Sequence, residues 1–287
     1  MEPWALTLLN ALVWGALWAL LAVGLSLIYG ALGVLNLAHG TFYMLGALLS
    51  WALTPTLGFW GALCVAPMIV GLIGAGLAQP LVIRRARAPL SSLLIMFGIM
   101  LILQQLVTLS LQMATGELRH AVAPPLRWPI AIGARFYDGY RVIVALVASA
   151  VLLGLWALWG WTRWGCMLRA VRDNHELARV VGIPVPRVQA GVFGLGAALA
   201  ALAGALTGPI TREVSPTMGT EILLVSVLIT VVGGMGSLGG AFAVAVLYSF
   251  LENFLTMLAD PMLARAGALV TIALILLIRP QGLGGAA

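Results

Sequence analysis

Long hydrophobic runs alternate with short polar or glycine-rich segments along nearly all of this 287-residue chain. A helix rises about 1.5 Å per residue, so about twenty apolar residues cross the roughly 30 Å hydrocarbon core of a bilayer. Runs of this kind predict about nine membrane-spanning helices, near residues 4–29, 37–53, 59–81, 91–112, 141–162, 190–210, 219–233, 240–258 and 266–279. We therefore expect an all-α, polytopic membrane protein, with a single transmembrane domain over residues 1–287.

Two glycine-dense breaks interrupt this pattern without supplying a hydrophilic loop. The first, YGALGVLNLAHG, follows the first span and contains Asn36, His39 and Gly40. The second, VVGGMGSLGGAFA, joins the seventh and eighth spans and contains Gly236 and Ser237. Irregular backbone within a membrane must be shielded by protein or line a cavity, so both breaks predict broken or re-entrant helices. Their residues either face a translocation route or gate, or hydrogen-bond the backbone groups that the breaks release.

The sixth span contains small residues at every fourth position: Gly196, Ala200, Gly204 and Gly208. In lipid, hydrophobic burial does not drive helices together, and a stripe of small residues lets another helix approach closely. The stripe predicts a packing face rather than a pore lining.

Residues 163–187 form the only long stretch that is dense in charge and weak in hydrophobicity. The sequence RWGCMLRAVRDNHELARVVGIPVPR contains five arginines against Asp173 and Glu176. The spacing predicts ion pairs from Glu176 to Arg172 and Arg179 on one helix face. A charged loop over about 163–189 is therefore expected to leave the membrane body.

This loop also has a predicted apolar face and a predicted end. Gly182 favours a helix stop, and Pro184 and Pro186 follow it. The apolar face contains Leu177, Val180 and Val181. A short amphipathic helix of this kind is typical of a docking element.

A second long connection, about 113–140, lies between the fourth and fifth spans. It is rich in proline and glycine, and RWPIAIGARF alternates weakly enough to suggest two short strands. With the N-terminus outside and the C-terminus in the cytoplasm, nine arginines fall inside and six outside. Because the dense clusters RRAR (84–87) and 163–187 both fall inside, the positive-inside rule favours this orientation.

Composition excludes several function classes. The chain is 62% hydrophobic and 8% charged, and all fifteen basic residues are arginine. Without lysine it cannot form a phosphate-binding P-loop or a Schiff base. Ser237 lacks a nucleophile elbow, because Met235 stands where that motif needs glycine. The net charge of +6 reflects arginines flanking the spans, so no nucleic-acid partner is expected.

Glu252 lies in the middle of the eighth predicted span, where a charged carboxylate is expensive. It could serve as a proton or cation relay, bond another helix through Gln104 or Gln105, or lie near the outer interface. We favour the interhelical bond.

Several motifs in order resemble one family. NLAHG with the downstream YMLGA, RAVRDNHELARVVGI continuing into GLGAALAALAGALTG, GGMGSLGGAFA and the terminal IRPQGLGG resemble the permease subunits of branched-chain amino acid ABC importers, the LivH type. The resemblance implies a non-catalytic subunit of a bacterial inner-membrane importer that works by alternating access. It also implies four kinds of partner: a LivM-like second permease, two cytoplasmic ATP-binding subunits, an extracytoplasmic substrate-binding protein and the lipid bilayer.

Within that family, the 163–187 region resembles the coupling helix that docks on the ATPase. The positions that match are Asp173, Asn174, Glu176, Ala178, Gly182 and Ile183. No cofactor is expected on this chain, because ATP and magnesium would be bound by the partner ATPase. Two alternatives stay open: an ion-coupled secondary transporter, which also has broken helices and an intramembrane carboxylate, and an ABC permease for urea or short-chain amides.

Overall fold

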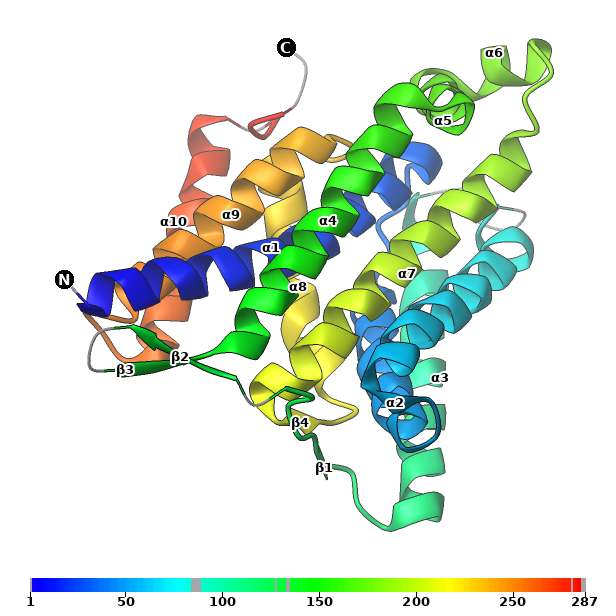
Figure 1. The fold of residues 1–287 in the computed structure, drawn as a ribbon. Coiled ribbons are helices and arrows are strands. Elements are labelled where there is room, and N and C mark those ends of the chain that lie inside the picture. The colour runs from blue at the N-terminus through cyan, green and yellow to red at the C-terminus, as the bar shows by residue number, and fades with distance from the viewer. Residues whose placement is uncertain (1, 84–88, 127, 133–134, 280, 285–287) are drawn as a thin grey trace.

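The computed structural model describes residues 2–83, 89–126, 128–132, 135–279 and 281–284, and it is mostly helical (Figure 1). The helices are α1 (Glu2–Leu32), α2 (His39–Leu77), α3 (Pro89–Thr115), α4 (Gly139–Trp161), α5 (Arg163–Asp173), α6 (His175–Val180), α7 (Val185–Thr211), α8 (Met218–Gly233), α9 (Leu238–Leu255) and α10 (Pro261–Ile278). A π-helical segment, Ala78–Ile83, continues from α2. The predicted all-α, polytopic class is confirmed.

Seven of the described helices are long and apolar enough to cross a membrane: α1, α2, α3, α4, α7, α9 and α10. The gap between the second and third predicted spans, residues 54–58, ends at the kink of α2. Both belong to α2, a 39-residue helix that changes direction at Gly58, where φ is 68° and ψ is 166°. A single glycine in the left-handed φ region makes this bend, so no polar segment is needed. Helix α8 is also apolar but is shorter than these seven, with 16 residues.

Helix α1 forms the centre of the body. It is hydrophobic all round, as expected for a helix enclosed by others, and it contacts α4, α7, α8 and α9. Trp18, Leu20 and Leu25 are among its fully buried side chains. Figure 1 shows α1 passing behind α4.

The small-residue stripe on α7 is a packing face, as predicted. A Cβ atom on Gly196 would lie 2.7 Å from the Gly24 carbonyl oxygen of α1, and one on Gly204 would overlap the Tyr43 carbonyl of α2. Both halves of α2 reach α7, because Gly46 lies against Ala201 and Gly71 against Gly194. Glycine is required at these crossings because backbone meets backbone.

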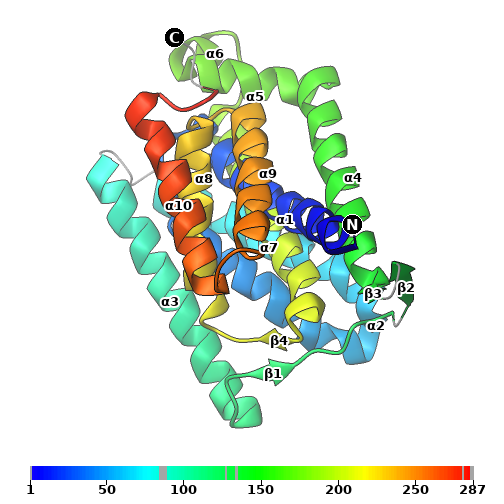
Figure 2. The same ribbon diagram turned by 90° about the vertical axis from the view of Figure 1, so that its left-hand side faces the viewer.

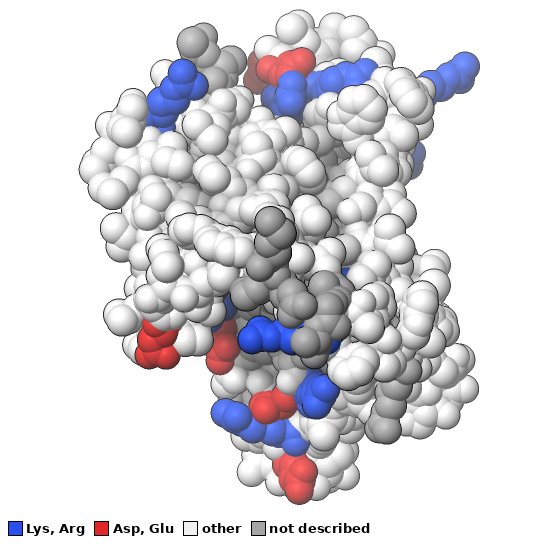
Figure 3. Space-filling model, turned by 60° about the vertical axis from the view of Figure 1, so that its left-hand side comes forward, with Lys and Arg blue, Asp and Glu red and all other residues white. Residues whose placement is uncertain are grey.

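Charged side chains gather at two opposite ends of the molecule, with an apolar belt between them (Figure 3). Helices α5 and α6 and the end of α10 lie at one end of the molecule, which we call the α6 end (Figure 2). The short strands lie at the opposite end, which we call the strand end. The elements that contain them divide the described arginines six to five. Arg163, Arg169, Arg172, Arg179, Arg187 and Arg279 lie on or next to the helix ends at the α6 end, and Arg119, Arg135, Arg141, Arg212 and Arg265 lie on or next to the elements at the strand end. Arg84, Arg85, Arg87 and Arg127 lie outside the described residues.

In the described part of the chain, the strand end contains two small antiparallel strand pairs. Strands β2 (Pro129–Ile132) and β3 (Arg135–Asp138) form the two-stranded unit suggested by RWPIAIGARF. Strands β1 (His120–Ala121) and β4 (Glu213–Val214) also pair. Beside them, Arg119 Nη1 forms an ion pair with Glu213 Oε1 at 3.3 Å. This second pair was not predicted, because two residues show no periodicity.

Candidate functional site

The charged loop folds into two helices rather than one. Thr162 caps α5 by accepting a hydrogen bond from the Gly165 amide at 3.0 Å. At Asn174 the backbone is extended, with φ −158° and ψ 110°, so α5 ends and α6 begins there. The predicted ion pairs from Glu176 to Arg172 and Arg179 are wrong: the break separates Arg172 from Glu176, and Arg172 pairs with Asp173 at 3.2 Å instead.

Helix α6 is capped at both ends. The Asn174 side-chain oxygen accepts from the amides of Glu176 and Leu177 at 2.9 and 3.0 Å. At the other end, the Ile183 amide donates to the Ala178 carbonyl and the Gly182 amide to the Arg179 carbonyl, with φ of Gly182 at 84°. This is the Schellman arrangement, which requires a left-handed residue at the position of Gly182.

Capping leaves an apolar tip exposed. The exposed fractions are 63% for Leu177, 83% for Val180 and 74% for Val181. Four of the six residues matched to the coupling helix form the hydrogen bonds that cap α6: Asn174, Ala178, Gly182 and Ile183. The other two, Asp173 and Glu176, are exposed and do not cap it. The tip is therefore a rigid, apolar surface at the end of a charged unit.

Asn174→Ala is expected to fray α6 without unfolding the membrane body. Losing an N-cap side chain costs about 1 kcal/mol, which corresponds to roughly a fivefold faster local opening. Amide hydrogen exchange of residues 175–180 measures this. Asn174→Asp keeps a capping oxygen and serves as the control; equal exchange in the Ala variant and the wild type would contradict the capping role.

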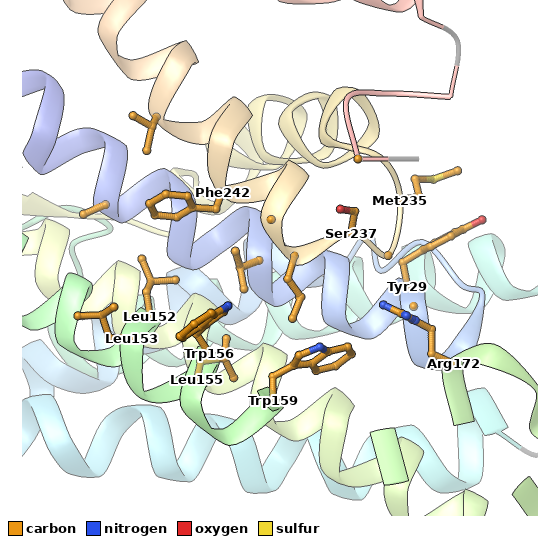
Figure 4. A pocket seen from close by; sticks show the side chains of 18 of the residues that line it. Tyr29, Leu152, Leu153, Leu155, Trp156, Trp159, Arg172, Met235, Ser237 and Phe242 are labelled. Atoms are coloured by element: carbon orange, nitrogen blue, oxygen red, sulfur yellow. The ribbon is translucent and has the colours of Figure 1, made fainter. Parts of the chain in front are cut away.

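A cavity of about 1080 Å³ opens between α1, α4 and α9. Figure 4 shows Trp156 and Phe242 along its apolar part, with Tyr29, Arg172, Met235 and Ser237 at the end near α5. Leucine side chains at 12, 152, 153 and 155 add to the apolar wall. The cavity thus has an aliphatic and aromatic body and a polar end near α5, here called the mouth.

Both glycine breaks reach this cavity, the first through Tyr29, Gly30 and Gly33. Gly236 and Ser237 line the wall, and Ser237 also caps α9 by accepting from the Gly240 amide at 3.2 Å. The C-terminal segment packs on the same break, because Leu283 and Gly284 donate to the carbonyls of Val232 and Gly233.

Asn36, His39 and Gly40 lie between helices and do not line the cavity. The Asn36 side-chain oxygen accepts from the Ala38 amide at 3.0 Å, and His39 Nε2 donates to the Leu21 carbonyl of α1 at 3.0 Å. A Cβ on Gly40 would overlap the Gly219 carbonyl of α8. In this conformation these three residues bond and pack against backbone.

The strongest aromatic and polar features of the cavity had no signal in the sequence. Trp156 and Trp159 lie on α4 within an unbroken hydrophobic span, and Arg172 and His175 lie in the charged loop. The packing of α5 against α4, with α6 following α5, brings them together. Arg172 stacks over the Trp159 ring, with its guanidinium carbon 5.4 Å from the ring centre.

Glu252 lies in the last turn of α9 and not in the middle of a span, because α9 ends at Leu255. Its carboxylate bonds Arg265 of α10 at 3.4 Å. The bond is interhelical, as favoured from the sequence, but the suggested partners Gln104 and Gln105 are wrong. The turn between α9 and α10 places Glu252 and Arg265 side by side. Among the described residues, no group of three or more His, Cys, Asp or Glu side chains could hold a metal ion.

Comparison with known proteins identifies relatives along the whole chain. LivH of Escherichia coli K12, a high-affinity branched-chain amino acid transport system permease protein, is 29% identical over 96% of this chain and 94% of its own length. BraD of Pseudomonas aeruginosa, described in the same terms, is 27% identical over 97% and 94%. A shorter match, 37% identical over 38% of this chain and 31% of the relative, is to the fructose import permease protein FrcC of Rhizobium meliloti.

A family model described as "Branched-chain amino acid transport system / permease component" matches residues 7–279. The match runs from α1 through α10 and includes both glycine breaks and the α5–α6 unit. It confirms the resemblance drawn from the motifs. This chain, a multi-pass membrane protein, belongs to the family of branched-chain amino acid transport permease components.

Proposed function

We propose that this chain is the membrane-spanning permease subunit of an ABC importer for branched-chain or related amino acids. The observation that carries the proposal is the α5–α6 unit, a doubly capped helix with an exposed apolar tip at one end of a membrane body. A tip of this kind suits a groove on a partner. Because the chain has no lysine for a P-loop, ATP and magnesium belong to that partner, an ATPase subunit.

The complete importer then contains a second permease, two cytoplasmic ATP-binding subunits and an extracytoplasmic binding protein. The α6 end faces the cytoplasm, so the N-terminus is outside and the C-terminus inside, in a bacterial inner membrane. The arginine-rich α5–α6 unit supports this orientation. The binding protein delivers substrate at the strand end, and closure of the ATPase pair moves α6 and opens the route inward by alternating access.

The cavity supports an aliphatic substrate. Leucine, tryptophan and phenylalanine side chains form the apolar body of its walls, while Tyr29, Arg172, His175 and Ser237 lie at the mouth. A branched aliphatic side chain loses little on entering such walls, whereas a polyhydroxyl or amide ligand gives up hydrogen bonds to water that they do not replace. Leucine, isoleucine and valine therefore fit the route better.

Reconstitution tests the proposal. The chain, its second permease and the ATPase are placed in liposomes with the binding protein, and uptake of radiolabelled leucine, fructose and urea is measured. We expect leucine uptake that requires ATP and persists when ion gradients are collapsed. Uptake that follows an ion gradient and needs no ATP would instead establish the secondary-transporter alternative.

Glu252→Gln distinguishes the same two mechanisms within this chain. The carboxylate is 20% exposed and its Arg265 partner 45% exposed, so a structural pair of this kind contributes about 1 kcal/mol or less. We expect ATP-driven uptake to stay within about twofold of the wild type. Glu252→Gln/Arg265→Gln, which removes both charges, is the control. Abolished uptake in the single variant with intact assembly would show a proton or cation relay.

A further inference from the structure

We infer that His175 and Gln189 are positioning residues that connect the docking helix α6 to the last turn of α1 at the cavity mouth. The inference rests on the proposed function and adds the path by which movement of α6 reaches the route. Three elements meet in this contact: α6 through His175, α7 through Gln189 and α1 through Ala31.

The hydrogen bonds have a fixed direction. Gln189 Nε2 lies 3.0 Å from the Ala31 carbonyl oxygen and 3.1 Å from His175 Nδ1. A carbonyl can only accept, so the amide nitrogen donates one hydrogen to Ala31 and the other to His175. His175 accepts at Nδ1 and carries its own proton at Nε2. One buried amide, 8% exposed, thus serves both helices.

This arrangement makes α6 and α1 move together. If α6 shifted alone, a buried amide hydrogen would lose its partner, which is costly compared with keeping the bond. An apolar contact at the same place could slide without such a penalty. The bond therefore transmits displacement of α6 to Ala31, one residue before α1 ends at Leu32.

Arg172 makes a second, independent contact with the same turn. A Cβ on Gly30 would lie 3.5 Å from Arg172 Cδ and 3.4 Å from the Gly236 Cα. Gly30 is thus held between the α5 side chain and the second glycine break. Arg172 is itself fixed by Asp173 and by the Trp159 ring. Arg172 of α5 thus lies directly against the end of α1, whereas α6 reaches it through Gln189 of α7.

The geometry locates the moving part of the cavity. Tyr29, Gly30, His175, Arg172 and Gly236 all line its mouth. A shift of the α1 end relative to Gly236 changes the mouth, while the apolar wall on α4 and α9 stays in place. His175 and Gln189 thereby tie ATPase docking to the width of the cytoplasmic opening.

Coupling in the complete importer tests this inference. Gln189→Leu keeps the side-chain size but removes both bonds, and His175→Ala removes one. We expect ATPase binding and ATP hydrolysis within about twofold of the wild type, with leucine transported per ATP reduced at least fivefold. His175→Asn, which places an acceptor where Nδ1 lies, should restore most of the transport. Gln112→Leu, the same change at an exposed site on α3, should have no effect.

The outcomes separate the two proposals. A wild-type complex without ATP-driven uptake would overturn the proposed function and this inference with it. A coupled wild type in which Gln189→Leu and His175→Ala are equally coupled would overturn this inference alone. If Gln189→Leu fails to fold, the comparison of His175→Ala with His175→Asn decides: equal transport per ATP in the two would overturn the connection.

Discussion

Gly204→Leu is expected to prevent the chain from reaching its folded state. A Cβ at this position would overlap the Tyr43 carbonyl oxygen and lie 3.2 Å from the Ala47 amide nitrogen of α2. Overpacking alone costs about 1–3 kcal/mol, and more where backbone must move. Since α7 also packs on α1, it cannot retreat from α2 without losing that contact. We expect less than a tenth of the wild-type yield of monodisperse protein in detergent.

Gly76→Leu is the matched control for this change. Gly76 also lies in a membrane helix, but a Cβ there meets no heavy atom within 4 Å. The Gly76 variant should melt within about 2 °C of the wild type, since surface changes usually alter stability by about 0.5 kcal/mol or less. If both variants fold equally well, the close α2–α7 crossing is wrong.

The close crossing could be predicted from the sequence because its signal is local. Small residues at every fourth position put Gly196 and Gly204 on one face of any helix. The same reasoning found the spans, since hydrophobic length alone marks them. It also separated the two halves of α2 on either side of Gly58, although no polar loop joins them.

The two-helix form of the docking unit also has a local signal in the sequence. Asn174 is a favoured N-cap residue, and its side chain starts α6 as such residues do. Counting charges at three- and four-residue spacing assumed one continuous helix. The predicted pairs of Glu176 were therefore wrong for a reason that is visible in the sequence itself.

The cavity had no such signal. Its wall combines α1, α4 and α9, and Trp156 and Phe242 line it from two helices that are far apart in the sequence. Hydrophobic periodicity cannot distinguish a lipid-facing tryptophan from one that lines a cavity, since both environments are apolar. For the same reason, Asn36 and His39, polar residues in a break, were natural route candidates, yet in this conformation they bond backbone away from the cavity.

Val180→Asp is expected to detach the ATPase and abolish leucine uptake while leaving the permease folded. Val180 is 83% exposed at the tip of α6, so the free protein loses little when it changes. In the proposed complex the side chain enters an apolar groove, where a carboxylate would be buried without a partner. Loss of a central interface contact costs about 2 kcal/mol or more, roughly a 30-fold weaker Kd.

Co-purification of the ATPase with the tagged permease measures this effect, beside the melting temperature of the permease alone. Phe136→Asp is the control, because Phe136 is 76% exposed on β3 at the opposite end of the molecule. It introduces the same charge at similar exposure and should leave ATPase binding unchanged. Because α6 is held by caps at Asn174 and Gly182, Val180→Asp cannot escape burial by unwinding the helix cheaply. Equal ATPase recovery with both variants would show that the partner does not dock on the α6 tip.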